Sequence, residues 1–410
     1  MHRISIVVMM ATLAGCSAST GSAAPDSGAA GEDGEGGDGG ASPDADASPF
    51  AGADGEAPQG EGGAPASDAS SLPDAPDTTP GALKADVSGL LDRGNNPNAP
   101  VGGSNFTKVP SAWQAVVSAF VVNATWADLQ AVQGGPIAAG NAIDQAIAFA
   151  APAHLQIKIR IAAGEFAPAW VKSLDGGPLP TTSGLGIGRW WMPDYEAAYA
   201  DLVAKLAALY DGVPEVRNVT IAGCMTLYAE PLLKDDVDPT VMIQAGYTNA
   251  LDQQCQHSAI QAHAAWHETH QSFSFNPYAN VNPATPAVDE AFTESLMDFC
   301  ATTLGKRCAL ENNSIRYPNN PGAYGAMYAH MGSLQASAGV PVDFQTATLV
   351  KLNTAPEQGL AAVLSWATGG FSSPVHASSV ELPSGYMTDG TLSSPAAYQT
   401  YAAALLADPH

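Results

Sequence analysis

From about residue 82 onward, the chain alternates short runs of β-branched and apolar residues with longer segments of helical period. Such alternation predicts βαβ units, whose strands lie parallel in one sheet. Seven units can be counted, and an eighth strand is expected within residues 83–91. Eight units close a barrel, so we predict an α/β fold, a (β/α)8 TIM barrel over residues 81–410. A doubly wound sheet is the alternative, but no strand is followed by the GxGxxG turn usual in that fold.

The expected elements have the lengths usual for such units. Strands are expected at residues 115–122, 155–162, 217–224, 271–276, 308–315, 342–349 and 378–382. Helices are expected at residues 141–151, 194–210, 241–267, 288–304, 322–338, 357–367 and 395–407. In the first of these helices, Ile143, Ile147 and Ala150 share one face, which is the pattern of a helix packed on a sheet.

The first fifteen residues have the features of a lipoprotein signal peptide. Arg3 provides a small positive region, and the apolar run at residues 4–13 is too short to span a bilayer core of about 30 Å. Leu13-Ala14-Gly15-Cys16 matches a lipobox, so we expect cleavage before Cys16 and lipidation of that residue. An ordinary secretory signal is the alternative. Ser17, rather than Asp, follows the cysteine, which favours the outer membrane or cell surface.

Residues 16–80 have the composition of a disordered tether. Beyond Cys16 this stretch is built from Gly, Ala, Ser, Pro and acidic residues, without Lys or Arg. Such a segment cannot bury enough apolar surface to offset the entropy lost on ordering. It carries about a third of the acidic residues, so the formal net charge of -25 overstates the acidity of the folded part. Strong acidity argues against nucleic acid as a partner.

Four cysteines remain when the expected lipidation site is set aside. An even number in a chain bound for an oxidising compartment predicts disulfides. Cys300 and Cys308 close a short loop between a helix and the next strand, so we expect them to pair. Cys224 and Cys255 would then pair by elimination, although four cysteines allow three connectivities. No CxxC or HExxH motif is present, so we expect neither a metal site nor a cofactor.

Polar and aromatic residues follow the ends of several predicted strands, where barrel enzymes carry their active sites. Aromatic rings stack on sugars, amides and acids bind their hydroxyls, and paired carboxylates cleave glycosidic bonds. We therefore expect a saccharide-binding cleft. Its candidate residues are Glu165, Trp170, Trp190, Trp191, Tyr228, Glu230, Asn276, Glu311, Asn312, Gln345 and Glu381.

The stretch at residues 124–171 resembles the (β/α)8 glycoside hydrolases of the large retaining clan, especially β-galactosidase-like members. The positions that carry the resemblance are Trp126, Asp128, Asp144, Gly164, Pro168 and Trp170. The resemblance implies that Glu230, after the fourth strand, is the general acid/base. It also adds Trp126 to the predicted substrate-binding residues.

Two departures from the clan's pattern leave the activity open. Ala229 stands where the clan has Asn before the acid/base, and Gln345 stands where its seventh strand carries the nucleophile. A second carboxylate would have to be Glu311 or Glu381, the latter far round the ring from Glu230, which favours an inverting or degenerate site.

Three hypotheses follow for this chain. The first is a surface-tethered glycoside hydrolase, and its alternative is a catalytically inactive carbohydrate-binding barrel. The third is an adhesion or structural lipoprotein without a small ligand. For the first two we expect a carbohydrate partner, a lipid anchor in the membrane and a monomeric chain.

Overall fold

The computed structural model describes residues 81–94, 103–234, 236–282, 287–317, 322–353, 359–390 and 392–407. The predicted signal peptide, the lipidation site Cys16 and the tether at residues 16–80 lie outside the described residues. Within the described ranges, no helix combines the length and apolar character needed to cross a membrane.

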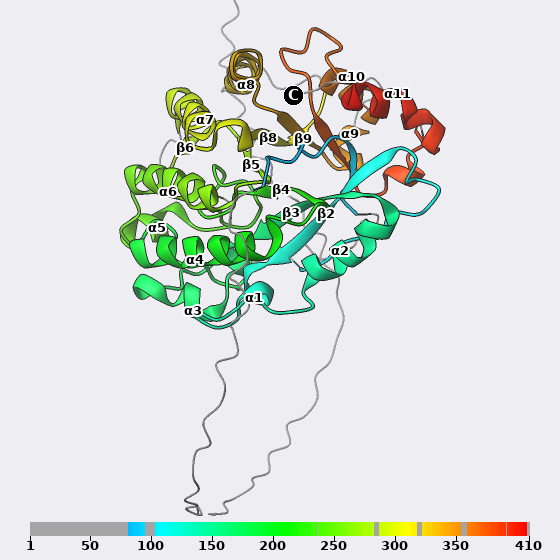
Figure 1. Ribbon diagram of the computed structural model, residues 1–410. Coiled ribbons are helices and arrows are strands. Elements are labelled where there is room, and N and C mark those ends of the chain that lie inside the picture. Colours follow the sequence, from blue (N-terminus) through cyan, green and yellow to red (C-terminus); the bar gives the residue numbers. More distant parts are fainter. Residues whose placement is uncertain are drawn as a thin grey trace, which may run out of the picture. The chain divides into compact units, whose positions relative to one another are not determined.

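Eight parallel strands close a barrel, which confirms the predicted fold class (Figure 1). Each barrel strand pairs with the next barrel strand along the chain, so that β5 pairs with β8, and the last pairs with the first. The barrel strands are β1 (Gly89–Asp92), β2 (Val117–Thr125), β3 (Gln156–Ala162), β4 (Val216–Thr220), β5 (His270–Ser274), β8 (Cys308–Ile315), β9 (Val342–Thr346) and β10 (Ser379–Leu382). A separate antiparallel pair consists of β6 (Ala279–Asn280) and β7 (Ala287–Val288).

Seven longer helices follow the strands from β2 onward, and Figure 1 shows helices on the outside of the strands. They are α2 (Ala142–Ala153), α4 (Pro193–Tyr210), α6 (Asn249–Ala262), α7 (Glu290–Leu304), α8 (Ala323–Ala338), α10 (Leu360–Ala367) and α11 (Pro395–Leu406). Short helices are α1 (Trp126–Leu129), α3 (Ala169–Lys172), α5 (Pro239–Gln244) and α9 (Leu349–Leu352), and 3-10 turns lie at Gly164–Phe166, Leu174–Gly176, His263–Ala265, Gly305–Arg307 and Tyr386–Thr388.

Polar side chains define where several helices begin. The Asn141 side chain accepts hydrogen bonds from the amides of Ile143 and Asp144 at the start of α2. Thr248 and Asp289 do the same for the first turns of α6 and α7. These contacts satisfy amides that have no partner within the helix, so local sequence fixes the start of each helix.

Several strands differ in extent from the predicted ranges, β9 among them, which ends at Thr346 rather than at residue 349. The strand expected at residues 83–91 pairs only over β1, and the one expected at residues 217–224 ends at Thr220. Beyond Thr220, the amide of Ala222 donates to the hydroxyl of Tyr199 on α4 at 2.8 Å. The chain therefore leaves the sheet early, because a helix side chain replaces the next strand partner.

Both predicted disulfides are present. Cys224 pairs with Cys255, and Cys300 pairs with Cys308. The first joins the loop after β4 to α6, and the second joins α7 to the start of β8. Disulfides of this kind are typical of exported proteins.

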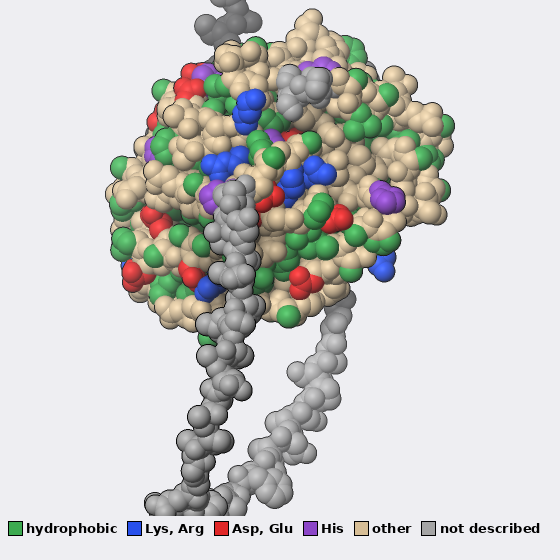
Figure 2. All heavy atoms as spheres, viewed as in Figure 1, with side chains coloured by type: hydrophobic (Ala, Val, Ile, Leu, Met, Phe, Trp, Pro, Cys, Tyr) green, Lys and Arg blue, Asp and Glu red, His purple; other side chains and the backbone are tan. Residues whose placement is uncertain are grey.

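The outer faces of the strands pack against the helices in a continuous apolar core. On β3, Ile157, Ile159 and Ile161 belong to this core, whereas Lys158 and Arg160 alternate with them. Alternate residues of a strand point to opposite faces, so the two basic residues point into the barrel. Only 13% of all residues are charged, and Figure 2 shows that most of the visible surface is uncharged.

Candidate functional site

A network of ion pairs fills the inside of the barrel. Lys158 on β3 lies 2.8 Å from Glu311 on β8 and 3.1 Å from Glu381 on β10. Arg160, also on β3, lies 2.5 Å from Glu381. None of these pairs joins neighbouring strands, so the contacts must cross the barrel interior. Lys158, Glu311 and Glu381 are at most 1% exposed.

The electrostatics of this network follow from burial and pairing. Burial alone would lower the pKa of Lys158, but the two carboxylates outweigh it and raise that pKa. Burial would raise the pKa of Glu381, yet Arg160, Lys158 and Arg93 bring it down to about 2. For Glu311, burial outweighs Lys158, and the nearby Glu381 adds to the rise of its pKa. Glu381 is therefore firmly ionised, whereas Glu311 depends on Lys158 for its charge.

A second polar layer also crosses the barrel interior. The side-chain amide of Asn218 donates to Asp86 at 3.0 Å and to Asp343 at 3.3 Å. Ser272 donates to the Asn218 oxygen at 2.5 Å, and Ser379 donates to Asp343 at 2.6 Å. Burial raises the pKa of Asp86 to about 7 and that of Asp343 well above its ordinary value. Among the described residues, these side chains form a buried polar layer inside the barrel.

Glu230 lies at the mouth, in the loop that follows β4, and is half-buried. The side-chain amide of Asn276, after β5, donates to its Oε2 at 3.0 Å. Glu230 also lies close enough to Arg93, Arg160 and Tyr324 to affect their pKa values. One carboxylate therefore accepts a hydrogen bond from an amide and lies within electrostatic range of two guanidinium groups and a phenol from different parts of the barrel.

A chain of hydrogen bonds fixes the orientation of Asn276. The Nδ2 of Asn312 donates to the backbone carbonyl of Phe275 at 2.6 Å, which identifies that atom as nitrogen. The same nitrogen donates to Oδ1 of Asn276 at 3.3 Å, and the hydroxyl of Tyr324 donates there at 3.2 Å. The amide nitrogen of Asn276 must then face Glu230. Tyr328 completes the chain by donating to Oδ1 of Asn312 at 2.7 Å.

Glu311 and Glu381, which were predicted to be catalytic, do not lie where the prediction put them. Glu311 and Glu381 lie inside the barrel, paired with Lys158 and Arg160, rather than open at its mouth. Glu230, by contrast, follows β4, which lies four positions round the ring from β10. The expected separation of Glu230 and Glu381 round the ring is therefore present.

Three of the tryptophans predicted to bind substrate are buried. Trp126 donates to the Gln130 side chain at 3.2 Å, and Trp190 donates to Asp252 at 2.8 Å. Trp191 packs edge-on against Trp190 with ring centroids 4.8 Å apart. These rings are at most 1% exposed and have no free face for a sugar, so they serve the core. These tryptophans lie in or next to the segments that connect helices and strands. Trp126 and Trp190 can be buried in such segments because their indole N–H groups have hydrogen-bond acceptors.

Trp170 is half-buried and packs edge-on against Trp126, with its N–H donated to the Gln130 carbonyl at 3.2 Å. Tyr228 and Gln345 are also half-buried, on the Glu230 loop and on β9. The contacts of Trp170 are those of a ring at the edge of the core, so its proposed role as a platform remains a prediction.

Glu165 belongs to a loop that packs directly on the Glu230 loop. Its backbone amide donates to the Thr226 carbonyl at 3.0 Å, and its side chain accepts from Ser183 at 2.8 Å. Burial and the neighbouring Asp236 raise the pKa of Glu165. Gly164 allows this close approach, because a Cβ there would lie 1.9 Å from the Thr226 oxygen and its φ is +51°.

Sequence reasoning missed the two arginines near Glu230. Arg93 donates to the Thr346 carbonyl at 3.2 Å, and burial lowers its pKa to about 10, although Glu381 and Glu230 oppose that shift. Arg160 could have been found from the alternation of residues 156–162, which places two basic residues on one face of β3. Arg93 follows a short strand and carries no comparable signal.

A groove lies beside β2, at the same end of the barrel as the mouth. Its volume is about 350 Å³, within the range of small-molecule sites. Asn105, Phe106, Asp128 and Gln145 contribute amides, a ring and a carboxylate to its lining. These are the types of side chain that bind sugar hydroxyls and sugar faces. No cluster of metal-binding side chains occurs among the described residues.

No family model and no curated protein matches this chain. Solved structures with some similarity include endo-glycoceramidase II from Rhodococcus sp., at 14% identity and a TM-score of 0.40 over 68% of this chain and 70% of that one. A putative α-L-fucosidase from Bacteroides thetaiotaomicron shares 8% identity, with a TM-score of 0.40 over 83% and 99% of the two chains. A family 1 β-glucosidase from Thermotoga maritima shares 10% identity, with a TM-score of 0.35 over 65% and 74%. At these levels the likeness adds no argument to the barrel that the strand pairing establishes.

Proposed function

We propose that the mouth of the barrel binds a poly- or oligosaccharide, with Glu230 as the central carboxylate. The observation that carries the proposal is the setting of Glu230: half-buried, bound by Asn276 and within electrostatic reach of Arg93 and Arg160. A carboxylate accepts hydrogen bonds from sugar hydroxyls, and guanidinium groups donate to them. The groove beside β2 has the volume of a small-molecule site and lies at the same end of the barrel, which supports saccharide binding at this end.

Binding without cleavage is the function that this geometry supports best. Hydrolysis through two carboxylates requires both to reach the sugar, about 5–5.5 Å or about 6.5–9.5 Å apart. Glu311 and Glu381 are sealed inside the barrel by Lys158 and Arg160. Gln345 stands on the seventh barrel strand, and an amide cannot act as the nucleophile. We therefore favour a carbohydrate-binding barrel in which neither Glu311 nor Glu381 serves as a second catalytic carboxylate.

Hydrolysis with Glu230 as general acid/base is the second candidate. Its support is the position of Glu230 after the fourth barrel strand, where the sequence resemblance puts that residue. The hydrogen bond from Asn276 to Oε2 holds the Glu230 carboxyl group in place, which serves either role.

The experiment is a glycan-array screen of the purified chain, followed by calorimetry and product analysis with the strongest-binding glycan. Glu230→Gln keeps the shape but removes the charge, so we expect its affinity to fall by about 10- to 150-fold, the usual worth of a hydrogen bond to a charged group. Glu215→Gln is the matched control, because Glu215 precedes β4 at the opposite end of the barrel.

The outcomes separate the candidates. Binding without any product after prolonged incubation supports the carbohydrate-binding barrel, and release of sugars that is lost in Glu230→Gln supports the hydrolase. Equal affinities of Glu230→Gln and the wild type, or the absence of any glycan binding, would contradict the proposal. The second of these results would favour an adhesion or structural role.

We also propose that the chain is a lipoprotein of the cell envelope, anchored through Cys16. The lipobox at residues 13–16 and the two disulfides support export. Expression in a bacterial host with radiolabelled palmitate tests the proposal. The wild type is expected to be labelled and to sediment with membranes, whereas Cys16→Ser remains unlabelled. Labelling of Cys16→Ser at the wild-type level would refute the assigned anchor.

A further inference from the structure

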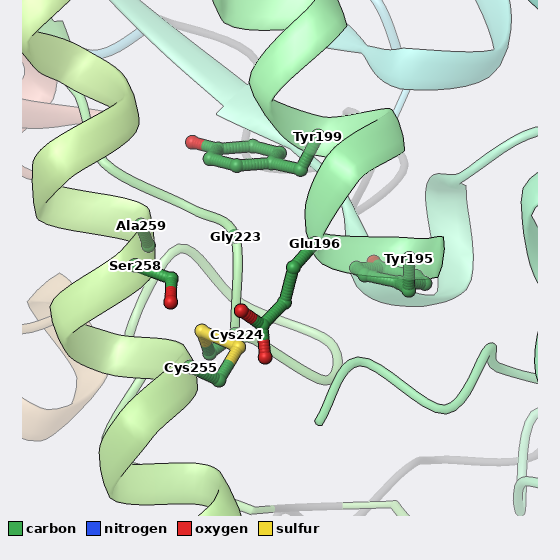
Figure 3. A pocket seen from close by; sticks show the side chains of 8 residues that line it. All are labelled: Tyr195, Glu196, Tyr199, Gly223, Cys224, Cys255, Ser258 and Ala259. Carbon is green, nitrogen blue, oxygen red and sulfur yellow. A yellow bond between two sulfur atoms is a disulfide. The ribbon is translucent and has the colours of Figure 1, made fainter. Parts of the chain in front are cut away.

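The loop that carries Glu230 is attached to one face of α6. The attachment points on the helix are Asp252, Cys255 and Gln256, which lie on one side because they are three and four residues apart. Cys255 forms the disulfide with Cys224, with Cα atoms 6.0 Å apart. Figure 3 shows this disulfide between the segment after β4 and α6, with the carboxylate of Glu196 turned toward the sulfur atoms.

Lys234, at the other end of the same loop, attaches it to α6. Its ammonium group donates to the carbonyl of Cys224 at 2.9 Å and to the carbonyl of Pro231, and lies 3.2 Å from Asp252. An ammonium group has three donors, so these three acceptors use all of them. The Lys234 side chain is only 6% exposed and lies 5.4 Å from the Trp190 ring. One buried cation thus ties the start of the loop, its end and the helix together.

A third contact reaches the residue next to Glu230. The side-chain amide of Gln256 donates to the carbonyl of Pro231 at 3.2 Å, and Pro231 directly follows Glu230. Residues 221–234 form no helix or strand, so the segment is held by individual contacts: those to α6 just described, and others such as Thr226 with Glu165 and Glu230 with Asn276. Irregular segments with few fixed contacts open locally at low free-energy cost. The helix contacts therefore limit how far Glu230 can move.

We propose that Lys234 is a positioning residue for Glu230, and that with the Cys224–Cys255 cross-link it makes α6 the rigid support of the mouth. The functional consequence rests on the proposed role of Glu230 in binding saccharide. Burial lowers the pKa of Lys234, and Asp252 opposes that shift, which explains why the acid is retained beside it. Replacing both Lys234 and Asp252 by neutral residues removes their ion pair without leaving a buried unpaired charge.

Lys234→Met/Asp252→Asn is the test variant, because the introduced asparagine side chain can still accept the hydrogen bond of Trp190. Lys205→Met is the matched control, since Lys205 forms a partly exposed pair with Asp201 within α4. Amide hydrogen exchange of residues 225–233 is measured in the intact chain. We expect exchange in this segment to become at least about 10-fold faster in the test variant, with the barrel strands unchanged.

The disulfides provide a second, independent comparison. Cys224→Ser/Cys255→Ser should also speed exchange at residues 225–233, whereas Cys300→Ser/Cys308→Ser, which removes the bond between α7 and β8, should not. Unchanged exchange in this loop in both the lysine and the Cys224 variants would overturn the proposal. Equal acceleration in the loop and all strands would overturn it too, because that pattern indicates global destabilisation.

Saccharide affinity is the readout that a purely structural role would not move. In Lys234→Met/Asp252→Asn we expect the affinity for the strongest-binding array glycan to fall by about 10-fold. The midpoint of urea unfolding should stay near that of the wild type. Loss of loop protection with unchanged affinity would refute the positioning role. If the wild type binds no glycan, the function proposed for Glu230 fails, while the exchange experiment still decides whether α6 holds the loop.

Discussion

Replacing Lys158 by Met should destabilise the barrel through one carboxylate, Glu311. Lys158 is fully buried and lies 2.8 Å from Oε1 of Glu311, whose Oε2 has no hydrogen-bond partner among the described residues. Glu381 also loses a partner, but it keeps Arg160 at 2.5 Å. Removing one member of a buried ion pair typically costs about 3–5 kcal/mol.

Proton uptake by Glu311 limits this cost. Keeping this carboxyl group protonated costs about 1.4 kcal/mol for each pH unit by which the solution lies above its ordinary pKa of 4.5. At pH 7 the cost is therefore about 3.4 kcal/mol. The folded-state pKa of Glu311 is already raised, and loss of Lys158 raises it further. The folded variant then binds a proton that the unfolded chain releases, so its stability falls as pH rises. We expect a loss of about 3 kcal/mol at pH 7 and about 1 kcal/mol at pH 5.

Urea unfolding followed by tryptophan fluorescence measures this loss at both pH values. Lys158→Met/Glu311→Gln should recover most of the stability at pH 7 and lose the pH dependence, because no carboxylate is left unpaired. Lys205→Met, which breaks a partly exposed pair, should change stability by less than about 1 kcal/mol. A loss in Lys158→Met that is the same at pH 5 and pH 7 would refute the electrostatic reasoning and indicate a packing defect.

Three further predictions concern the same barrel. Burial raises the pKa of Asp86 from 3.8 to about 7. The protonated side chain therefore stabilises the fold fully below pH 3.8, and this stability is lost as the pH rises through about 7. Asp86→Asn should raise the urea midpoint at pH 8 but not at pH 4. The pKa of Glu381 is about 2, so the stability that its charge provides is lost as pH falls from about 4.5 toward 2. In acid unfolding, the free energy of unfolding of Glu381→Gln should differ most from that of the wild type above pH 5 and least near pH 2. Gly164→Ala should lower the free energy of unfolding by about 1–3 kcal/mol, because its Cβ meets the Thr226 carbonyl at a positive φ; an unchanged urea midpoint would contradict this.

The barrel could be predicted from sequence because its signals are local. The alternation of Lys158 and Arg160 with isoleucines, and the capping residue Asn141, act within a few neighbouring residues. The early end of β4 could not be predicted, because it depends on the Tyr199 hydroxyl, 23 residues away on a helix. Local pattern therefore determined which elements form, and tertiary contacts determined where some of them end.

The site was harder to predict, because its chemistry depends on distant partners. Glu311 meets Lys158 across 153 residues, and Glu381 meets Arg160 across 221 residues. Nothing in the local sequence distinguishes a carboxylate sealed by a cation from one open to a ligand. The alternation on β3 separates Lys158 and Arg160 from the isoleucines, but it does not show which carboxylates on other strands these two bases meet.

The most direct measurement of the central claim is a crystal structure of the chain with its strongest-binding array glycan. The account predicts electron density for sugar at the barrel mouth, with a sugar hydroxyl within hydrogen-bond distance of the Glu230 carboxylate and Asn276 still bound to that carboxylate. Sugar bound only on another surface, with Glu230 unchanged and out of contact, would contradict it.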